Sequence, residues 1–244
     1  PGAKEGRALA FTWTQERIRW YLDASARTDF HARLADYIRP YLRPEDHLCD
    51  LGCGLGRVSL ALAGEVAKVT CVDVDPQVLA VLEEDAANRG IRNLRTRACG
   101  AAELQESFDV GLMVYFGTPF SLMEACLHKA RRILIRVMDQ PGRDRPLQSR
   151  PRETPAEVCR ALGERGYAVE RLQATLAFHQ PLRSRAEGAA FLACSYPQAT
   201  PQEIQAVLEE RLEETGEPEF PYRLPKTRRL EILAVTIPEQ RRRS

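Results

Sequence analysis

Short hydrophobic runs alternate with amphipathic stretches through the first two thirds of this chain. The short apolar runs are typical of buried strands, whereas the stretches between them repeat their apolar residues every three or four positions, as helices do. Strands are predicted over residues 47–50, 66–73, 94–99, 108–116 and 132–138, with helices following residue 57 and over 76–88 and 120–130. Strands that alternate with helices through short loops predict a doubly wound α/β fold, with a mostly parallel sheet covered on both faces.

Two amphipathic helices are predicted before the first strand. Thr12 and Gln15 have the spacing of a capping box, so Thr12 is the predicted N-cap of the first helix. This helix is rich in aromatic residues and carries Tyr21, and a second amphipathic stretch covers residues 30–41. Two interpretations stay open: the two helices pack on the core, or the first of them is a lid over a ligand.

The second half of the chain has a different pattern, with longer loops and two further predicted strands, 167–178 and 231–237. A long segment between these strands reads as helical, and an insertion of this length in a compact α/β unit indicates function. We therefore predict one domain. Its parts are an N-terminal helical cap (1–45), a cofactor-binding core (46–139), and a C-terminal part (140–244) with a helical insertion (181–225) before the last strand.

Composition narrows the class of protein. The chain has 244 residues, 44% of them hydrophobic, and its 35 basic residues nearly balance 34 acidic ones. This near-neutral charge argues against nucleic acid as a partner, and we interpret the basic clusters at 143–152, 226–229 and 241–243 as solvated. No apolar run is long enough to cross a membrane, and no signal-peptide pattern is present. The odd number of cysteines, seven, indicates reduced thiols in a cytoplasmic protein without a metal site.

Residues 48–58 (LCDLGCGLGRV) carry the strongest chemical signal. A strand passes through three glycines at alternate positions into a helix, so backbone N–H groups are left open to a ligand. The spacing is wrong for a dinucleotide fingerprint, because Arg57 stands where the third glycine belongs, and the Lys-Ser/Thr of a phosphate loop is absent. Asp73, at the carboxyl end of the second strand, faces the same edge and suits a ribose diol. Asp75 is the predicted N-cap of the next helix.

The run Asp50-Leu51-Gly52-Cys53-Gly54-Leu55-Gly56, followed by Val72-Asp73-Val74-Asp75, resembles the Rossmann-like (class I) S-adenosylmethionine-dependent methyltransferases. The resemblance covers residues 45–138 and implies S-adenosylmethionine as the cofactor. It implies that the glycines and Asp50 surround the amino-acid moiety, that Asp73 accepts hydrogen bonds from the ribose hydroxyls, and that Val74 packs on the adenine. The cofactor-binding residues implied are Asp50, Gly52, Cys53, Gly54, Gly56, Asp73, Val74, Gly100, Ala101 and Val114.

One departure from the family concerns the third strand. Members commonly carry an acid there that reads the adenine amino group, but this chain has Gly100 at the matching position. The backbone of Gly100 and Ala101, or the side chain of Glu103, is the expected replacement.

The segment after the fourth strand, residues 113–120, is where the acceptor is expected. It lacks the Asn/Asp-Pro-Pro-aromatic motif common in methyltransferases that act on nucleobase or amide nitrogen, which argues against that type. Tyr115 is the candidate catalytic residue, able to align or deprotonate an acceptor, against an equal case for a structural role. Trp20, Tyr21 and Phe116 are the candidate substrate residues, whereas His31, His128 and His179 are candidate bases that we interpret as structural.

The predicted function is transfer of a methyl group from S-adenosylmethionine to a small or medium organic acceptor, mainly by positioning and desolvation in a lidded pocket. Two alternatives stay open. One is an RNA or protein methyltransferase that docks through the Arg-rich loops, and the other is a cofactor-binding subunit without transfer activity. The sequence does not predict the oligomeric state.

Overall fold

The computed structural model of the chain describes residues 12–117, 119–140 and 153–239, and its centre is a seven-stranded sheet. The strands lie in the order β3-β2-β1-β4-β5-β10-β6, and β10 alone runs antiparallel to the other six. The predicted α/β fold with a mostly parallel sheet is therefore confirmed. The strands are β1 (His47–Leu51), β2 (Lys68–Asp73), β3 (Leu94–Ala98), β4 (Phe108–Val114), β5 (Ala130–Asp139), β6 (Ala168–Ala177) and β10 (Thr227–Thr236).

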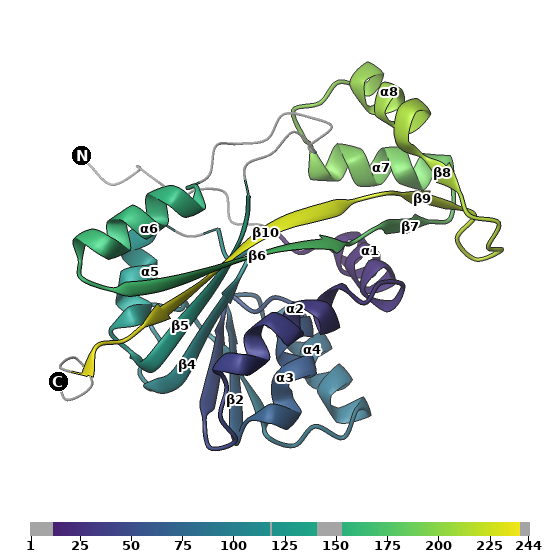
Figure 1. Cartoon of the computed structure of the whole chain (residues 1–244). Helices are drawn as coiled ribbons and strands as arrows, with labels where there is room; N and C mark the ends of the chain where they lie inside the picture. The colour runs from purple at the N-terminus through teal and green to yellow at the C-terminus, as the bar shows by residue number, and fades with distance from the viewer. Residues whose placement is uncertain (1–11, 118, 141–152, 240–244) are drawn as a thin grey trace, which may run out of the picture.

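Helices cover both faces of this sheet (Figure 1). One face packs against α2 (Phe30–Ile38), α3 (Arg57–Leu62) and α4 (Pro76–Asn88), and the other against α5 (Phe120–Leu127) and α6 (Pro155–Glu164). Single 3-10 turns, η1 (Arg39–Tyr41) and η2 (Ala63–Glu65), follow α2 and α3. The chain moves outward from β1 to β3 and then crosses to β4 on the other side of β1. The order of strands thus reverses between β1 and β4, where ligands of such sheets bind.

The first helix, α1 (Gln15–Ala26), has its N-cap two residues later than predicted, at Thr14. The side chain of Thr14, not Thr12, accepts the N–H of Arg17, because the first intrahelical bond joins Ile18 N to Thr14 O (3.0 Å). The Thr12 carbonyl accepts instead from the Arg17 guanidinium (2.7 Å). Asp75 caps α4 as predicted, accepting the N–H of Gln77 at 2.9 Å.

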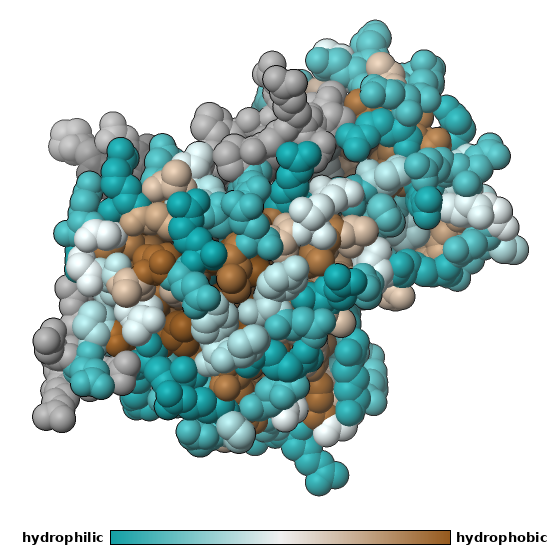
Figure 2. Space-filling model, in the orientation of Figure 1, coloured by the Kyte–Doolittle hydropathy of each residue, from teal (hydrophilic) through white to brown (hydrophobic). Residues whose placement is uncertain are grey.

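The insertion before the last strand contains strands as well as helices. Besides α7 (Arg185–Ser195) and α8 (Pro201–Arg211) it forms an antiparallel sheet of β7 (Gln180–Leu182), β9 (Tyr222–Leu224) and β8 (Glu213–Glu214). Strands of two or three residues are too short to show an alternating pattern, so the sequence predicted only the helices. The insertion has a small apolar core of its own and sits at the far end of the long strands β6 and β10 (Figure 1). Its outer helix, α8, is mainly hydrophilic at the surface (Figure 2).

Helix α1 is tied to this insertion. The Trp20 indole N–H donates to Glu187 on α7 (3.1 Å), and the Trp20 carbonyl accepts from Gln180 on β7 (3.1 Å). Arg183 pairs with Asp23 of α1 at 2.7 Å. The N-terminal helical segment and the insertion therefore contact one another, although 160 residues separate Trp20 from Gln180. None of the described helices is both long and apolar enough to cross a membrane.

Candidate active site

The glycine turn, residues 52–56, joins β1 to α3. Gly52, Gly54 and Gly56 all have positive φ (72°, 52° and 58°), a conformation that side chains rarely adopt. Gly52 N and Cys53 N both donate to Val72 O of β2, at 2.8 and 3.0 Å, which fixes the turn against the neighbouring strand. A Cβ on Gly52 would lie 2.4 Å from the Phe116 ring. Backbone hydrogen bonds and close packing thus shape the turn, and only glycine fits at position 52.

Asp73 lies against this turn, as the sequence predicted. Its Oδ2 accepts the N–H of Gly54 (2.8 Å) and its Oδ1 accepts the N–H of Asp75 (3.0 Å). Each carboxylate oxygen has a further lone pair, so Asp73 can brace the turn and still accept hydroxyl donors. Val74, the next residue, is 68% exposed, and it is the one large apolar side chain so exposed among the described residues.

Asp50 is buried beneath the turn with one oxygen unpartnered. Ser59 Oγ donates to its Oδ2 at 2.7 Å, but Oδ1 has no hydrogen-bond partner. Burial raises the pKa of Asp50 to about 7, the Ser59 bond opposes this shift, and the nearby charge of Asp73 adds to it. A buried acid with an open oxygen is costly unless a donor or cation comes to it.

Glu103, one of the expected replacements for the missing third-strand acid, has its carboxylate bonded within its own loop. The Glu103 carboxylate accepts the N–H of Gly100 (2.9 Å), and Glu103 N donates back to Gly100 O (2.9 Å). Ala101 is buried at this turn. Glu103 therefore closes the loop after β3 on itself, and Gly100 and Ala101 lie at its start.

The chain after β4 packs two aromatic rings against opposite faces of the sheet. Tyr115 has φ 53°, the one positive value at a non-glycine residue in the described chain, and its hydroxyl is buried without a partner. Such strain is concentrated at functional sites. The guanidinium of Arg228, on β10, lies 3.6 Å from the centre of the Tyr115 ring and is held by Asp139 through two bonds of 2.8 and 3.1 Å. Phe116 packs on Gly52, and Val114 lies at the end of β4, half-buried.

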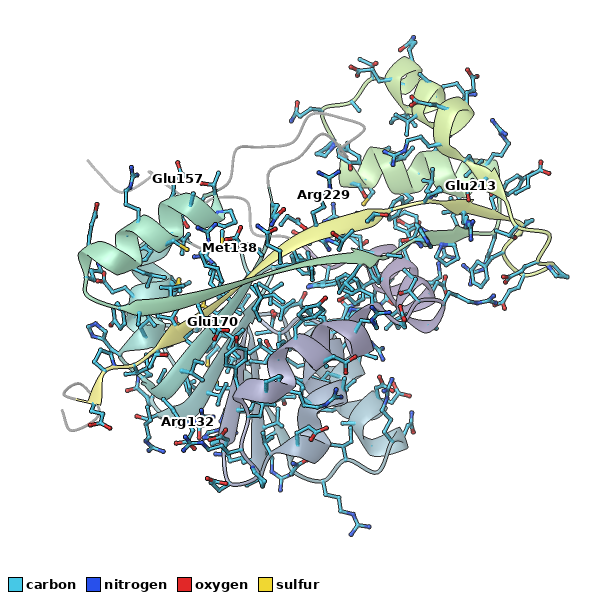
Figure 3. The ribbon with its side chains drawn as sticks, in the orientation of Figure 1. Arg132, Met138, Glu157, Glu170, Glu213 and Arg229 are labelled. Atoms are coloured by element: carbon cyan, nitrogen blue, oxygen red, sulfur yellow. The ribbon has the colours of Figure 1, made fainter. Side chains whose placement is uncertain are left out.

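Five rings from four parts of the chain form what we call the aromatic cluster. They contact one another at centroid distances of 4.8 to 6.3 Å. Figure 3 marks the neighbouring ends of β5 and β10 with Met138 and Arg229. The members of the aromatic cluster are Tyr21, Phe30, His31, Tyr115 and Phe178.

The polar atoms of the aromatic cluster are held neutral. The Tyr21 hydroxyl and His31 Nε2 are 2.8 Å apart. Burial, with help from Arg57 and Arg228, lowers the pKa of His31 to about 3, and burial raises the pKa of Tyr21 to about 12. Burial also raises the pKa of Tyr115. No member of the aromatic cluster carries a charge near neutral pH.

Trp13, just before α1, joins the aromatic cluster to the glycine turn. The Trp13 ring lies 3.0 Å from the position of a Cβ on Gly54 and packs edge-on against Tyr21 (5.6 Å). Of the candidate substrate residues, the structure thus brings Tyr21 and Phe116 to the site. Trp20 faces the other way, against Phe191 of α7 (5.5 Å).

Several residues of the site went unrecognised in the sequence. The interpretation of 226–229 as a solvated basic cluster is wrong for Arg228, whose side chain is 16% exposed and paired with Asp139. Phe30 and Phe178 carry no motif. Arg228 and Phe178 come close to Tyr115 only because β10 lies antiparallel between β5 and β6. No local sequence pattern predicts this pairing. The Arg-rich segments 143–152 and 241–243 lie outside the described residues.

The mostly parallel sheet, with its glycine turn and Asp73 at the point where strand order reverses, has the arrangement of the class I S-adenosylmethionine-dependent methyltransferases. Residues 48–136 match the family model described as a methyltransferase domain, so this part of the chain is such a domain. S-adenosylmethionine is the cofactor of this class, which confirms the predicted cofactor.

Individual relatives agree with this class. Over 41 residues the chain is 49% identical to ribosomal RNA small subunit methyltransferase A of Corynebacterium efficiens, and over 104 residues it is 31% identical to the methyltransferase YcgJ of Bacillus subtilis. These matches cover 17% and 41% of the chain, and they span only 14% and 40% of the two relatives.

Solved structures share the fold over most of the chain. The YcgJ structure has a TM-score of 0.58 at 15% identity, covering 84% of this chain and 97% of its own. A magnesium protoporphyrin IX methyltransferase from Synechocystis, solved with bound S-adenosylmethionine, has a TM-score of 0.52 at 16% identity, covering 91% and 85%.

The buried carboxyl of Asp50 gives a pH dependence that can be measured. Its pKa in the folded protein, about 7, lies above the ordinary value of 3.8, so its favourable contribution is fully present below about pH 4 and is lost as the pH rises through 7. Between pH 5 and pH 8 we expect the free energy of unfolding of the wild type to fall by on the order of 3 kcal/mol relative to Asp50→Asn. Urea denaturation of both proteins without cofactor measures this difference. A difference that is the same at both pH values would contradict it.

Proposed function

We propose that this protein transfers the methyl group of S-adenosylmethionine to a small or medium organic acceptor that carries no charge where it meets the aromatic cluster. The observation that carries the proposal is the buried hydroxyl of Tyr115, which has no partner and lies among rings next to the glycine turn. An acceptor with one polar group among apolar surroundings would satisfy it.

The residues at the sheet edge fit the cofactor. Asp50 Oδ1 offers an open, buried acceptor for the amino group of the cofactor's methionine part. Asp73 has lone pairs left for the ribose hydroxyls, and the exposed Val74 offers an apolar surface for the adenine. When bound, S-adenosylmethionine supplies a methyl group made electrophilic by its positively charged sulfur.

The chain contributes position and exclusion of water. Tyr115 orients the acceptor through its hydroxyl, and the stacked, Asp139-paired guanidinium of Arg228 holds the Tyr115 ring in place. His31 stays neutral and keeps the Tyr21 hydroxyl engaged, so neither residue acts as a charged group. Trp13 and α1 cover the glycine turn. Positioning of two reactants in a dry site accounts for large rate accelerations without a dedicated base.

An RNA acceptor is the second candidate, and the match to a ribosomal RNA methyltransferase favours it. That match spans only 14% of the relative and 17% of this chain, which is too short to carry over an RNA-binding surface. Among the described basic residues of 226–229, Arg228 is turned inward on Tyr115 and so is not available to a polyanion.

The test is transfer of a labelled methyl group. S-adenosylmethionine with a tritiated methyl is incubated with the protein and with a panel of uncharged aromatic and heteroaromatic alcohols, amines and thiols, and separately with total RNA. We expect label in a small acceptor, with no transfer above background to RNA. Label in RNA that declines steeply with salt would favour the second candidate. Cofactor binding without label in any acceptor would favour a subunit without transfer activity.

A further inference from the structure

A cavity beside the glycine turn has a volume of about 360 Å³. It opens between the turn that joins α1 to α2 and the outer side of α3. Its walls include Ser25, Thr28 and Ala32 from the first two helices and Arg57 and Arg89 from α3 and the end of α4. His31 of the aromatic cluster reaches the wall, but neither the glycines of the turn nor Asp73 or Tyr115 lines it, and the proposed methyl transfer gives this cavity no ligand.

The wall of this cavity carries an excess of positive charge. Arg57 and Arg89 both pair with one carboxylate, Asp85; the Arg89 Nε to Asp85 Oδ1 distance is 2.9 Å. Two guanidinium groups thus share one negative charge. The Arg57 Nε is buried and has no hydrogen-bond partner. A buried guanidinium N–H without an acceptor is rare in folded proteins and is the donor that oxyanions bind.

The other polar groups at the cavity are the start of helix α2, two hydroxyls and His31. Helix α2 begins at Phe30, and its N-cap, Asp29, makes no side-chain cap hydrogen bond, so the helix presents its first N–H groups without that cap. The hydroxyl hydrogens of Ser25 and Thr28 are engaged by the carbonyls of Tyr21 (2.6 Å) and Ala24 (2.9 Å). His31 is neutral. The hydroxyls of Ser25 and Thr28 therefore offer only lone pairs, so the guanidinium groups and the first N–H groups of α2 are the donors at the cavity, and no wall residue is an acid.

We propose that this cavity binds a phosphate-type oxyanion, either free phosphate or the phosphate group of a small phosphorylated metabolite. Arg57 and Arg89 bind its oxygens, with the first turn of α2 as a further set of donors. The cavity exceeds the size of a single tetrahedral anion, which leaves room for an attached organic group. Because Arg57 follows the glycine turn directly, an anion here lies next to the cofactor-binding segment without touching its glycines.

Calorimetric titration tests the site with two probes, inorganic phosphate and glycerol phosphate, in chloride buffer of constant ionic strength. We expect Arg89→Gln to weaken binding at least about tenfold, because it removes a charge-assisted donor. Arg92→Gln is the matched control: Arg92 is exposed, lies three residues away and does not line the cavity, so the same change in net charge should leave binding unaltered. Ala32→Glu, which places an acid on the exposed wall residue, should abolish binding.

Each outcome either identifies the phosphate compound that binds or contradicts the proposed site. Binding of inorganic phosphate identifies the free anion as sufficient, and binding of glycerol phosphate alone identifies an organic phosphate. The proposal is overturned if neither probe binds, or if Arg92→Gln weakens binding as much as Arg89→Gln. It is also overturned if S-adenosylhomocysteine displaces the probe competitively, because the anion then occupies the cofactor site. Failure of methyl transfer has no bearing on these results.

Discussion

Asp73→Asn is expected to weaken the binding of S-adenosylhomocysteine, the demethylated product, about 100-fold. The Asp73 carboxylate accepts the N–H groups of Gly54 and Asp75, and by the family resemblance it also accepts both ribose hydroxyls. Hydrogen bonds to a charged group contribute roughly 1.5 to 3 kcal/mol each, and an amide of the same shape turns an NH2 group toward donors. A loss of about 3 kcal/mol corresponds to about two orders of magnitude in Kd. Isothermal titration calorimetry measures it.

Asp75→Asn is the control for this result. Asp75 stands two residues away at the same edge and caps α4 through the N–H of Gln77, a role that Asn fills equally well. Affinity for S-adenosylhomocysteine should stay within about threefold of the wild type, since no ligand contact is assigned to Asp75. If both variants lost affinity alike, the effect would belong to the loop after β2 and not to the Asp73 carboxylate.

Tyr115→Phe is expected to make the protein more stable and less active. Its hydroxyl is buried with no partner, and an unsatisfied polar group costs about 1 to 3 kcal/mol. Removing the oxygen should therefore raise the free energy of unfolding by about 1 kcal/mol. The same change removes the group that orients the acceptor, and loss of orientation costs about 100-fold in rate. Urea denaturation and kcat with the accepted substrate are the measurements, with Kd for S-adenosylhomocysteine unchanged.

Tyr21→Phe makes the same chemical change at the other tyrosine of the aromatic cluster, where the opposite sign is expected for stability. The Tyr21 hydroxyl bonds His31 Nε2 at 2.8 Å, so its removal leaves a buried ring nitrogen unpartnered and should cost about 1 kcal/mol or more. A stability loss in both variants would show that the Tyr115 hydroxyl has a partner. A full kcat in Tyr115→Phe would leave Tyr115 with a structural role only.

The cofactor end of the site was predictable because its residues are close in sequence. A strand, three glycines and a helix form one continuous segment, and Asp73 ends the next strand. Because the two strands run parallel, their carboxyl ends meet at the same edge of the sheet. The N-cap Asp75 followed from local chemistry in the same way. The cap of α1 was placed wrongly at Thr12 because two threonines precede this helix, and the sequence pattern did not show which carbonyl accepts the first intrahelical bond.

The acceptor end depends on long-range packing. Arg228 belongs to a basic run that is indistinguishable from a solvated loop until β10 is seen to pair with β5 and turn that side chain over Tyr115. Trp20 and Tyr21 are neighbours on one aromatic helix, and no sequence pattern separates their roles. In the structure α1 lies between the aromatic cluster and the insertion. Tyr21 therefore contacts the aromatic cluster, and Trp20 contacts α7.

The position of β10 also sets the order in which parts of the chain can fold during synthesis. Strand β6 pairs with β10 and with no other strand of the described sheet, so the backbone of β6 stays unpaired while the ribosome makes the next 49 residues, from 178 to 226. The insertion lies entirely within that interval and has its own apolar core, so it can collapse first. Closure of this long loop is slow, and an open strand edge is prone to aggregate. We expect yield during expression to depend more on residues of β10 than on those of β1 to β4.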